Sequence, residues 1–445
     1  MSDTKQPTIL VIIGISGDLS QRKLLPALSE IAQAGVLPDA FRIVGVSRRD
    51  LKVADVVPAG GEFWDQHLEL HQMDLENKQA YHDFAKQLDG IERSLGGSAQ
   101  RLFYLSVPPE ATQTVVEMLG DSGLAEVPNT KLLLEKPFGT DLATAEELVD
   151  HLKKHFKEEQ VYRIDHYLAK EMAQNLIVFR SANPVFSETW NSKFISSIEI
   201  IASETIGIEG RKTFYEQTGA LRDVVQSHLL QLAALTLMEL PKLNDMPSIP
   251  RLRCQALEAL QPAKPTDVIR AQYQDYRQEV DNPKSNVETF VSLKLESSEA
   301  RWADVPIILT TGKALKEQFT EIRVSYRGEG NTDANMLILR IQPDESVQVR
   351  LWVKKPGYDN ALQQIPLSFE YKNHFNSKLP AAYERVFVDA MRSDHSLFTT
   401  GQEVLASWRI LAPVQAAWAK SGDDLRTYKS GSAPEDVLRP AKTVA

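Results

Sequence analysis

The sequence lacks three features: a second cysteine, a long hydrophobic run and an excess of positive charge. Cys254 is the only cysteine, so no intrachain disulfide can form, and we expect a reducing compartment, the cytoplasm. The longest early apolar run, Ile9–Ile13, has the length of a strand and cannot cross a bilayer. The first residues, MSDTKQP, lack the charged and apolar regions of a signal peptide, so no membrane association is expected.

The charge balance excludes one class of partner. Lys and Arg number 50 and Asp and Glu 60, which gives a formal net charge of −10. A nucleic-acid-binding protein normally presents a basic face, so no nucleic-acid partner is expected. If the substrate is an anion, the field of the whole chain repels it, and binding must come from a few local cations.

The composition is that of an ordinary globular protein, with 42% hydrophobic and 25% charged residues. A single hydrophobic core rarely grows to 445 residues, so we expect two domains. No internal repeat or low-complexity tract is evident.

In the first part of the chain, short apolar runs alternate with helical patterns, which is typical of parallel βαβ units. The predicted strands are Thr8–Ile13, Phe41–Val46, Glu69–Asp74, Arg101–Val107 and Thr130–Leu134. The predicted helices are Lys23–Gln33, Tyr81–Leu95, Ala111–Leu119 and Leu142–Phe156. We therefore expect an α/β nucleotide-binding domain over residues 1–165.

Beyond Asp165 the pattern changes. The predicted helical stretches are Gln217–Met238 and Ala381–Trp418. The predicted strands are Glu288–Leu295, Ile307–Leu309, Glu321–Tyr326, Met336–Gln342 and Val347–Val353. Alternation such as E-I-R-V-S-Y indicates a sheet with one wet face. We expect residues 166–445 to form an α+β domain.

The stretch ILVIIGISGDLSQRKLLPAL reads as a strand, a glycine turn and a helix. Gly14 permits the tight turn, and Gly17 permits the backbone to approach a pyrophosphate at the helix N-terminus. Ser20 is small enough for close packing of helix and strand. The alternative is a βα connection that binds nothing, but the flanking strand and helix favour a dinucleotide site.

The end of the second predicted strand, G-V-S-R-R, indicates which dinucleotide is bound. NAD sites usually place an acidic residue there, which holds the ribose 2′-hydroxyl. Arg48 and Arg49 instead suit a 2′-phosphate, by charge and by bidentate hydrogen bonds, which favours NADP. The alternative is a pair of solvated loop arginines.

Two further segments concentrate polar residues. In LLLEKPFG, Lys136 follows an apolar strand, at the carboxyl end where α/β sheets place ligands. The segment YRIDHYLAKE contains Asp165, His166, Tyr167 and Lys170. The alternatives are a surface lysine before a proline turn, and a helix cap followed by packing residues.

A third segment, ALRDVVQSHLLQLAAL, places Asp223 and His228 within an apolar helical pattern. Such a histidine is often a satisfied core residue. Taken with the other segments, however, it indicates a dehydrogenase, in which histidine takes the hydroxyl proton as hydride leaves and a carboxylate orients the ring. His166 and Lys170 are the cations that a phosphate on the substrate requires.

These segments resemble the glucose-6-phosphate dehydrogenase family. The family signature R-I-D-H-Y-L-G-K-E is similar to R-I-D-H-Y-L-A-K-E at residues 163–171. The other matching segments are G-x-x-G-D-L, E-K-P-F-G, F-R-S-A-N-P, G-I-E-G-R, R-D-V-x-Q-x-H-L-L-Q, A-Y-E-R and Y-K-S-G-S. The matches run in order from Gly14 to about Pro434, nearly the whole chain.

The resemblance implies a Rossmann domain followed by an α+β domain with a large, mostly antiparallel sheet. It implies oxidation of D-glucose 6-phosphate at C1 to 6-phosphoglucono-1,5-lactone with reduction of NADP, the first step of the oxidative pentose phosphate pathway. NAD stays open as an alternative cofactor. Dimerisation through the large sheet is implied, as a homodimer or a dimer of dimers, and no metal is expected.

The resemblance also implies residue roles, with His228 as the general base and Asp165 as its carboxylate partner. The implied phosphate clamp is His166, Tyr167 and Lys170, with Tyr383 as a further member. The other implied substrate residues are Lys136, Glu204, Asp223, Lys313 and Gln342. The implied cofactor residues are Gly14, Ser16, Gly17, Asp18, Leu19, Arg48, Tyr104 and Lys136.

The chain departs from the family pattern at four single residues, in its tail, which reads S-A-P-E, and in a shorter segment from Leu51 to Gln100. Ala169 replaces a glycine, Ser227 an asparagine, Thr310 an arginine and Gln318 a basic residue. None of these changes removes an implied catalytic group, although the last two lower the local positive charge.

Two other functions stay open. One is a dehydrogenase of a different hexose phosphate, since the sequence does not determine the stereochemistry of the sugar. The other is a non-catalytic NADPH sensor. Asp165, His228 and Lys136 are all present, which argues against a sensor because a sensor needs none of them.

Overall fold

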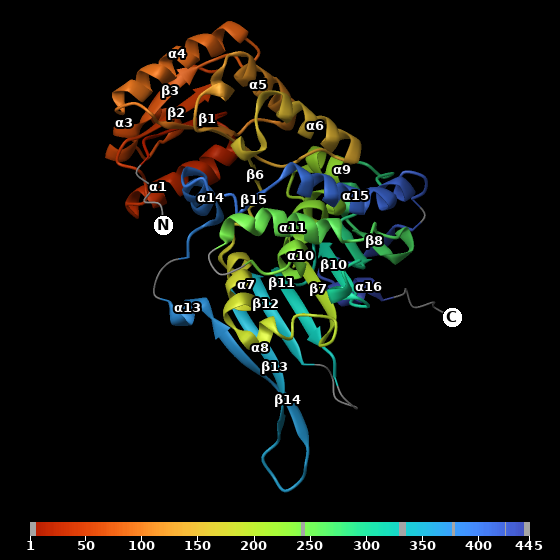
Figure 1. The fold of residues 1–445 in the computed structure, drawn as a ribbon. Coiled ribbons are helices and arrows are strands. Elements are labelled where there is room, and N and C mark those ends of the chain that lie inside the picture. The colour runs from red at the N-terminus through yellow and green to blue at the C-terminus, as the bar shows by residue number, and fades with distance from the viewer. Residues whose placement is uncertain (1–5, 242–244, 329–334, 376–378, 423, 440–445) are drawn as a thin grey trace. The chain divides into compact units, whose positions relative to one another are not determined.

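The structure is a computed structural model that describes residues 6–241, 245–328, 335–375, 379–422 and 424–439 (Figure 1). It divides into two compact units. The first comprises residues 1–139, 143–169 and 380–404, and the second comprises residues 140–142, 170–379 and 405–445. Residues 380–404, which fall in the second predicted domain, therefore belong to the first unit.

The first unit is built on a seven-stranded sheet with the order β15-β6-β5-β4-β1-β2-β3 (Figure 1). All neighbours are parallel except β15, which is antiparallel to β6. The strands are β1 (Thr8–Ile13), β2 (Phe41–Ser47), β3 (Leu68–Gln72), β4 (Gln100–Leu105), β5 (Thr130–Leu134), β6 (Val161–Ile164) and β15 (Phe398–Thr399). The order 3-2-1-4-5-6 confirms the predicted Rossmann fold, in which ligands bind at the carboxyl ends of the strands.

Helices α1 and α14 lie side by side against one face of this sheet (Figure 1). The apolar core on this face joins Leu10 and Leu102 of the strands to Leu28 of α1 and Phe387 of α14. The helices of the unit are α1 (Leu25–Gln33), α2 (Val53–Val56), α3 (Glu62–His67), α4 (Lys78–Ser94), α5 (Pro109–Asp121), α6 (Leu142–His155) and α14 (Ala382–Met391). The predicted helical stretch Ala381–Trp418 is divided by β15.

The sequence pattern did not predict β6, because Arg163 interrupts its apolar run. The side chain of Arg163 is buried and pairs with Glu158 at 2.6 Å. A charged residue can occupy a buried strand when a partner neutralises it, and here the partner lies in the turn just before the strand.

The second unit contains a nine-stranded sheet with the order β14-β13-β12-β11-β7-β10-β9-β8-β16. Neighbours are antiparallel except β7 with β10 and β8 with β16, which confirms the predicted mostly antiparallel sheet. The strands are β7 (Ile195–Ser203), β8 (Val268–Tyr273), β9 (Phe290–Leu295), β10 (Ile307–Gly312), β11 (Phe319–Tyr326), β12 (Met336–Gln342), β13 (Ser346–Lys354), β14 (Leu362–Glu370) and β16 (Arg426–Tyr428). The sequence analysis did not predict β7, β8, β14 or β16.

Helices of the second unit pack on this sheet, with α7 against β12 and the π-helical segment η4 against β7 and β10. The helical elements are α7 (Glu171–Ala182), α8 (Pro184–Ser187), α9 (Lys212–Ala220), η4 (Leu221–Leu229), α10 (Leu230–Leu237), α11 (Ile249–Glu258), α12 (Tyr276–Glu279), α13 (Tyr371–His374), α15 (Gly401–Trp418) and α16 (Pro434–Leu438). Buried Arg180, from the F-R-S-A-N-P segment, donates to the carbonyls of Leu235 and Met238 at 2.7 and 2.8 Å and so caps α10.

No helix in the described part of the chain is long and apolar enough to cross a membrane.

Candidate active site

The glycine turn after β1 folds as the sequence predicts. Gly14 has a φ of +93°, and a Cβ there would lie 2.1 Å from the Ser106 carbonyl oxygen, so only glycine fits. The N–H of Gly17 donates to the Gly14 carbonyl at 2.9 Å. The hydroxyl of Ser20 lies within hydrogen-bonding distance of the Gly14 carbonyl (3.1 Å) and the Ser106 hydroxyl (2.9 Å). These contacts hold the following helix close to the end of β4.

A cavity of about 630 Å³ opens over this turn. This volume is typical of a small-molecule or cofactor site. The predicted cofactor residues that line it are Gly14, Ser16, Gly17 and Arg48. Asp18, Leu19, Tyr104 and Lys136 are not part of this lining, and Asp18 pairs with Arg22 at 2.7 Å on the surface.

Arg48 and Arg49 both reach the cavity from the end of β2. The Arg48 carbonyl accepts a hydrogen bond from Gln72 at 3.1 Å, and the Arg49 N–H donates to the Ser47 hydroxyl at 3.1 Å. These bonds fix the backbone of the loop. Both arginine side chains are exposed, so their guanidinium groups are accessible to an anion.

The sequence analysis missed several lining residues, among them Ser47, Asp74, Ser106 and Thr114. The sequence feature that could have identified them is their position. Three lie at or just beyond the ends of parallel strands, and Thr114 lies in helix α5, which follows β4. The edge of a parallel sheet is formed by residues that are far apart in sequence, so no single motif contains them.

The carboxyl ends of β4, β5 and β6 gather a second set of residues in the first unit. The Tyr104 hydroxyl donates a hydrogen bond to the Glu135 carboxylate, and Tyr383 of α14 also bonds to it. Lys136 and Asp165 interact with the same carboxyl through their charges. Burial raises the pKa of Glu135 to about 7, against the opposing effect of the two tyrosines. Glu135 lies within the matched E-K-P-F-G segment, but the sequence analysis gave it no role.

The D-H-Y segment turns directly after β6. The Asp165 carboxylate accepts the N–H of Tyr167 at 2.9 Å, which fixes the turn. The His166 ring lies 5.2 Å from the Tyr167 ring and 6.4 Å from the Tyr383 ring, between centroids. The methyl group of Ala169, one of the departures, is buried in the apolar core of the unit.

In the second unit, β7, β10 and β12 run in the same direction, so their carboxyl ends share one sheet edge. Glu204 follows β7, Lys313 follows β10, and Gln342 ends β12. The Lys313 ammonium pairs with the Glu204 carboxylate and lies 5.4 Å from the centre of the Tyr215 ring. The side chain of Gln342 donates to the Thr320 hydroxyl at 3.3 Å.

The predicted helix Gln217–Met238 is broken at Gly219, which has a φ of +64°. A Cβ at Gly219 would lie 2.5 Å from a carboxylate oxygen of Glu288. That carboxylate accepts the Leu221 N–H at 2.9 Å, and the Glu288 carbonyl accepts the Ala220 N–H at 3.0 Å. Glu288 therefore caps the new helix, and desolvation raises the pKa of its carboxyl.

The new helix begins as the π-helical segment η4, in which hydrogen bonds span five residues. This winding brings Asp223 and His228, which are separated by five positions, towards one face. His228 is 3% exposed. The Ser227 hydroxyl, at another departure, donates to the Asp223 carbonyl at 3.1 Å. Burial is the main cause that raises the pKa of Tyr215, and the charges of Asp223 and Glu204 add to it, so both carboxylates lie in the neighbourhood of this tyrosine.

Lys170 directly precedes α7, and its carbonyl accepts the first helical N–H groups, from Ala173 and Gln174. The other predicted substrate residues of the second unit are Glu204, Asp223, Lys313 and Gln342. Those of the first unit are Lys136, His166, Tyr167 and Tyr383. The predicted base His228 belongs to the second unit and its predicted partner Asp165 to the first.

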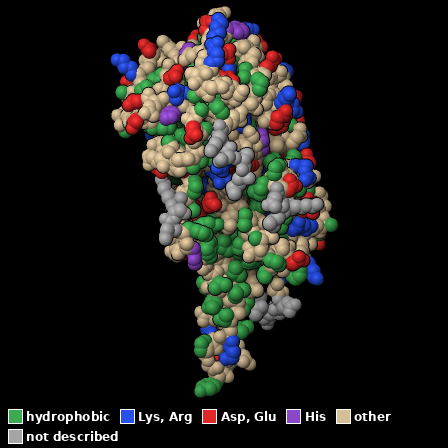
Figure 2. All heavy atoms as spheres, turned by 60° about the vertical axis from the view of Figure 1, so that its left-hand side comes forward, with side chains coloured by type: hydrophobic (Ala, Val, Ile, Leu, Met, Phe, Trp, Pro, Cys, Tyr) green, Lys and Arg blue, Asp and Glu red, His purple; other side chains and the backbone are tan. Residues whose placement is uncertain are grey.

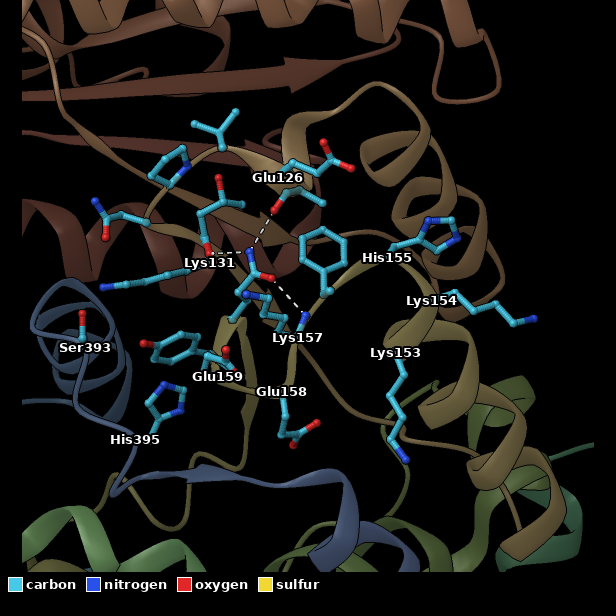
Figure 3. Close-up of a pocket in the computed structure, with 18 residues that line it drawn as sticks. Glu126, Lys131, Lys153, Lys154, His155, Lys157, Glu158, Glu159, Ser393 and His395 are labelled. Atoms are coloured by element: carbon cyan, nitrogen blue, oxygen red, sulfur yellow. Dashed lines mark hydrogen bonds between the residues drawn. The ribbon is translucent and has the colours of Figure 1, made fainter.

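A further cavity of about 710 Å³ in the first unit contains none of these residues (Figure 3). It lies near the starts of β5 and β6, away from the strand ends that carry the glycine turn. Figure 3 shows Lys153 and His155 coming from the end of α6, and Glu158 and Glu159 from the following turn. Cations and carboxylates are mixed in this lining, so it favours no ligand of either charge.

The fold and the site together define a class: proteins in which a Rossmann unit binds a dinucleotide and a second, α+β unit carries polar groups at one sheet edge. Comparison with known families makes the assignment specific. The model described as "Glucose-6-phosphate dehydrogenase, NAD binding domain" matches residues 11–175, and "Glucose-6-phosphate dehydrogenase, C-terminal domain" matches residues 177–439. The chain belongs to the glucose-6-phosphate dehydrogenase family, and its first unit is the nicotinamide-dinucleotide domain of that family.

Individual relatives agree with this assignment. Glucose-6-phosphate 1-dehydrogenase of Chlamydia muridarum is 35% identical, over 98% of this chain and 94% of its own. The Bacillus subtilis enzyme of the same name is 34% identical, over 97% and 96%. A solved "Glucose-6-phosphate dehydrogenase in complex with its substrate glucose-6-phosphate" is 30% identical over 100% of both chains, with a TM-score of 0.91. Gal80p of Saccharomyces cerevisiae, 12% identical over 93% of this chain and 97% of its own, with a TM-score of 0.57, shares the fold alone.

Proposed function

We propose that this chain oxidises the C1 hydroxyl of D-glucose 6-phosphate to 6-phosphoglucono-1,5-lactone, with NADP as the hydride acceptor. One observation carries the proposal. A glucose-6-phosphate dehydrogenase solved with its substrate matches the chain over its whole length, and the implied groups Asp165, His228 and Lys136 are all present.

The glycine turn fits a dinucleotide, since Gly14 lies where a Cβ would collide with Ser106, and the cavity of about 630 Å³ opens directly over it. Arg48, with Arg49 beside it, would meet the 2′-phosphate of NADP through charge-assisted hydrogen bonds. When bound, the nicotinamide supplies the site that accepts hydride. The alternative cofactor NAD would leave both arginines without a phosphate to bind.

His228 is proposed as the base that removes the C1 hydroxyl proton. Its burial keeps the imidazole away from bulk water, and its helix is fixed by the cap at Glu288. Asp165 is proposed as the carboxylate that orients and stabilises the ring. A histidine suits this step because its ordinary pKa lies near neutrality.

His166, Tyr167 and Lys170 are proposed to bind the substrate phosphate, since three hydrogen-bond donors, two of them able to carry positive charge, lie within five residues. Glu204 and Asp223 are proposed to accept hydrogen bonds from sugar hydroxyls, with Lys313 and Gln342 as the far wall. Lys136 is proposed to lie between cofactor and sugar.

The hairpin β13–β14 supports a homodimer. Its register pairs Leu351 with Ile365 and Val349 with Leu367, so these side chains lie on one face of the sheet. Leu351, Ile365 and Leu367 are 39%, 41% and 67% exposed. Figure 2 shows hydrophobic side chains gathered over this hairpin. Apolar surface of this kind marks an interaction site, and we propose that a second copy of the chain covers it.

The test is an absorbance assay for NADPH formation with NADP and a panel of sugar phosphates. Glucose 6-phosphate should give the largest kcat/KM. A larger value with another hexose phosphate would move the proposal to that sugar. No turnover with any of them, together with measurable NADPH binding, would favour the sensor.

A further inference from the structure

Glu135 lies where three elements of the first unit meet. It follows β5 directly and precedes Lys136 in the chain. Tyr104, from the neighbouring strand β4, donates its hydroxyl proton to the Glu135 carboxylate. Tyr383, from α14, makes a second side-chain hydrogen bond to it. Glu135 therefore links Tyr104, which is implied to bind the cofactor, to Tyr383, which is implied to bind the substrate.

The direction of these hydrogen bonds limits what the tyrosines can do. A tyrosine hydroxyl has a single proton, and an ionised carboxylate only accepts. While Glu135 is ionised, Tyr104 and Tyr383 both give their protons to it. Each hydroxyl oxygen then presents only lone pairs elsewhere, so Tyr383 cannot donate to a phosphate.

The charges around Glu135 oppose one another. Burial and the carboxylate of Asp165, which follows β6, favour its neutral form. The two tyrosine hydroxyls and the adjacent Lys136 favour the ionised form. The result is a carboxyl that titrates near neutrality, with a pKa raised to about 7. The titratable groups that affect it from the elements around it are thus Tyr104, Lys136, Asp165 and Tyr383.

We propose that Glu135 is a positioning residue of this site, whose ionised carboxylate fixes the hydroxyls of Tyr104 and Tyr383 beside Lys136. This inference rests on the proposed dehydrogenase function. When Glu135 takes up a proton, its carboxyl gains a donor and loses acceptor capacity, so it holds the two tyrosine hydroxyls less firmly. The negative charge beside Lys136 is lost in the same step. The site therefore changes from an ordered to a less ordered state as the pH falls through about 7.

The experiment compares kcat/KM for glucose 6-phosphate in wild type and Glu135→Gln between about pH 5.5 and about pH 9. Gln has the same shape but carries no charge. We expect the variant to be about tenfold slower than wild type at pH 8 and close to wild type at the acid end, where Glu135 is protonated. His228 is present in both proteins, so its own titration cancels in the ratio.

A merely structural role would give a ratio that does not change with pH, and that result would overturn the inference. Glu403→Gln is the matched control, since Glu403 is a buried carboxyl of the same unit that accepts the backbone N–H of Thr400 at 2.7 Å. Its ratio to wild type should not depend on pH. Wild type that does not oxidise glucose 6-phosphate at all would instead refute the proposed function.

A second pair of variants keeps the inference testable if Glu135→Gln alone folds poorly. Tyr383→Phe removes one of the hydrogen bonds that stabilise the ionised carboxyl. With Glu135 in place, the fall in kcat/KM of Tyr383→Phe towards low pH should have its midpoint at a higher pH than in wild type. An unchanged midpoint, or wild-type kcat/KM in Glu135→Gln at pH 8, would contradict the assignment.

Discussion

Lys313 and Glu204 form an ion pair at the edge of the second unit's sheet, and the lysine is 3% exposed. The two residues follow parallel strands that are direct neighbours, so the register of the sheet places them together. The sequence analysis named both as substrate residues but did not predict that they pair. Because they pair, replacing one of them leaves the other without its partner charge.

Lys313→Met should leave Glu204 without its partner and lower the free energy of unfolding by about 3 kcal/mol. The double variant Lys313→Met/Glu204→Gln should lose less than the single one, because no unpaired charge remains. Urea unfolding followed by fluorescence measures both. Lys316→Met is the control: Lys316 pairs with Glu317 on the surface, and its loss should cost less than about 1 kcal/mol. Equal losses at Lys313 and Lys316 would contradict the prediction.

His228→Asn should lower kcat on the order of 10²–10⁴-fold, because no other group is proposed to take the C1 proton. The KM for glucose 6-phosphate should change little. Steady-state kinetics at saturating NADP provide the measurement. Ser227→Ala, next to it on the same helix, should keep most of the turnover. Near-normal turnover in His228→Asn would refute its role as the base.

Arg48→Ala should reduce NADP affinity about tenfold or more, which is the effect of losing one charge-assisted hydrogen bond. NAD affinity should barely change, since NAD has no 2′-phosphate. The measurement is the ratio of kcat/KM with NADP to kcat/KM with NAD, compared between wild type and Arg48→Ala. Lys52→Ala, which removes a positive charge from the same loop outside the cavity lining, should leave the ratio unaltered. If Arg48→Ala also leaves it unaltered, the 2′-phosphate contact lies elsewhere.

Glu135 should also make stability depend on pH. Its pKa is raised from an ordinary value of 4.5 to about 7, so between these values the folded chain binds more protons than the unfolded chain. Its contribution to the free energy of unfolding therefore falls as the pH rises through this window, by on the order of 3 kcal/mol. Glu135→Gln does not titrate, so its Tm relative to wild type should increase from pH 4.5 to pH 8. Calorimetry showing a constant difference would contradict this.

The glycine turn and the Arg48–Arg49 pair could be predicted because each is a local signal. Gly14 is required by the backbone conformation of its own turn and the close approach of Ser106. The strands that flank these two segments are runs of apolar residues, which can be recognised from the local sequence alone. The sheet of the first unit could therefore be predicted strand by strand, apart from the short β6 and β15.

The predicted helix Gln217–Met238 shows where a sequence period is not enough. The apolar pattern continues across Gly219, but the carboxylate of Glu288 caps a new helix there. That contact joins residues 67 positions apart. The π-helical winding that brings Asp223 and His228 towards one face also differs from the 3.6-residue period used to interpret a sequence.

The sequence by itself determined the dinucleotide turn, the class of fold and the residue types available for chemistry, because these depend on neighbours within a few positions. Tertiary structure alone decided which of those residues meet. It placed α14 on the Rossmann sheet, so that Tyr383 reaches Glu135, and it set Lys313 against Glu204. Helix α14 begins at Ala382, far along the chain from the strands it packs on. Its contacts with the strand ends depend on packing over the whole unit. Only the folded chain determines that packing, because local propensity carries no information about segments hundreds of residues apart.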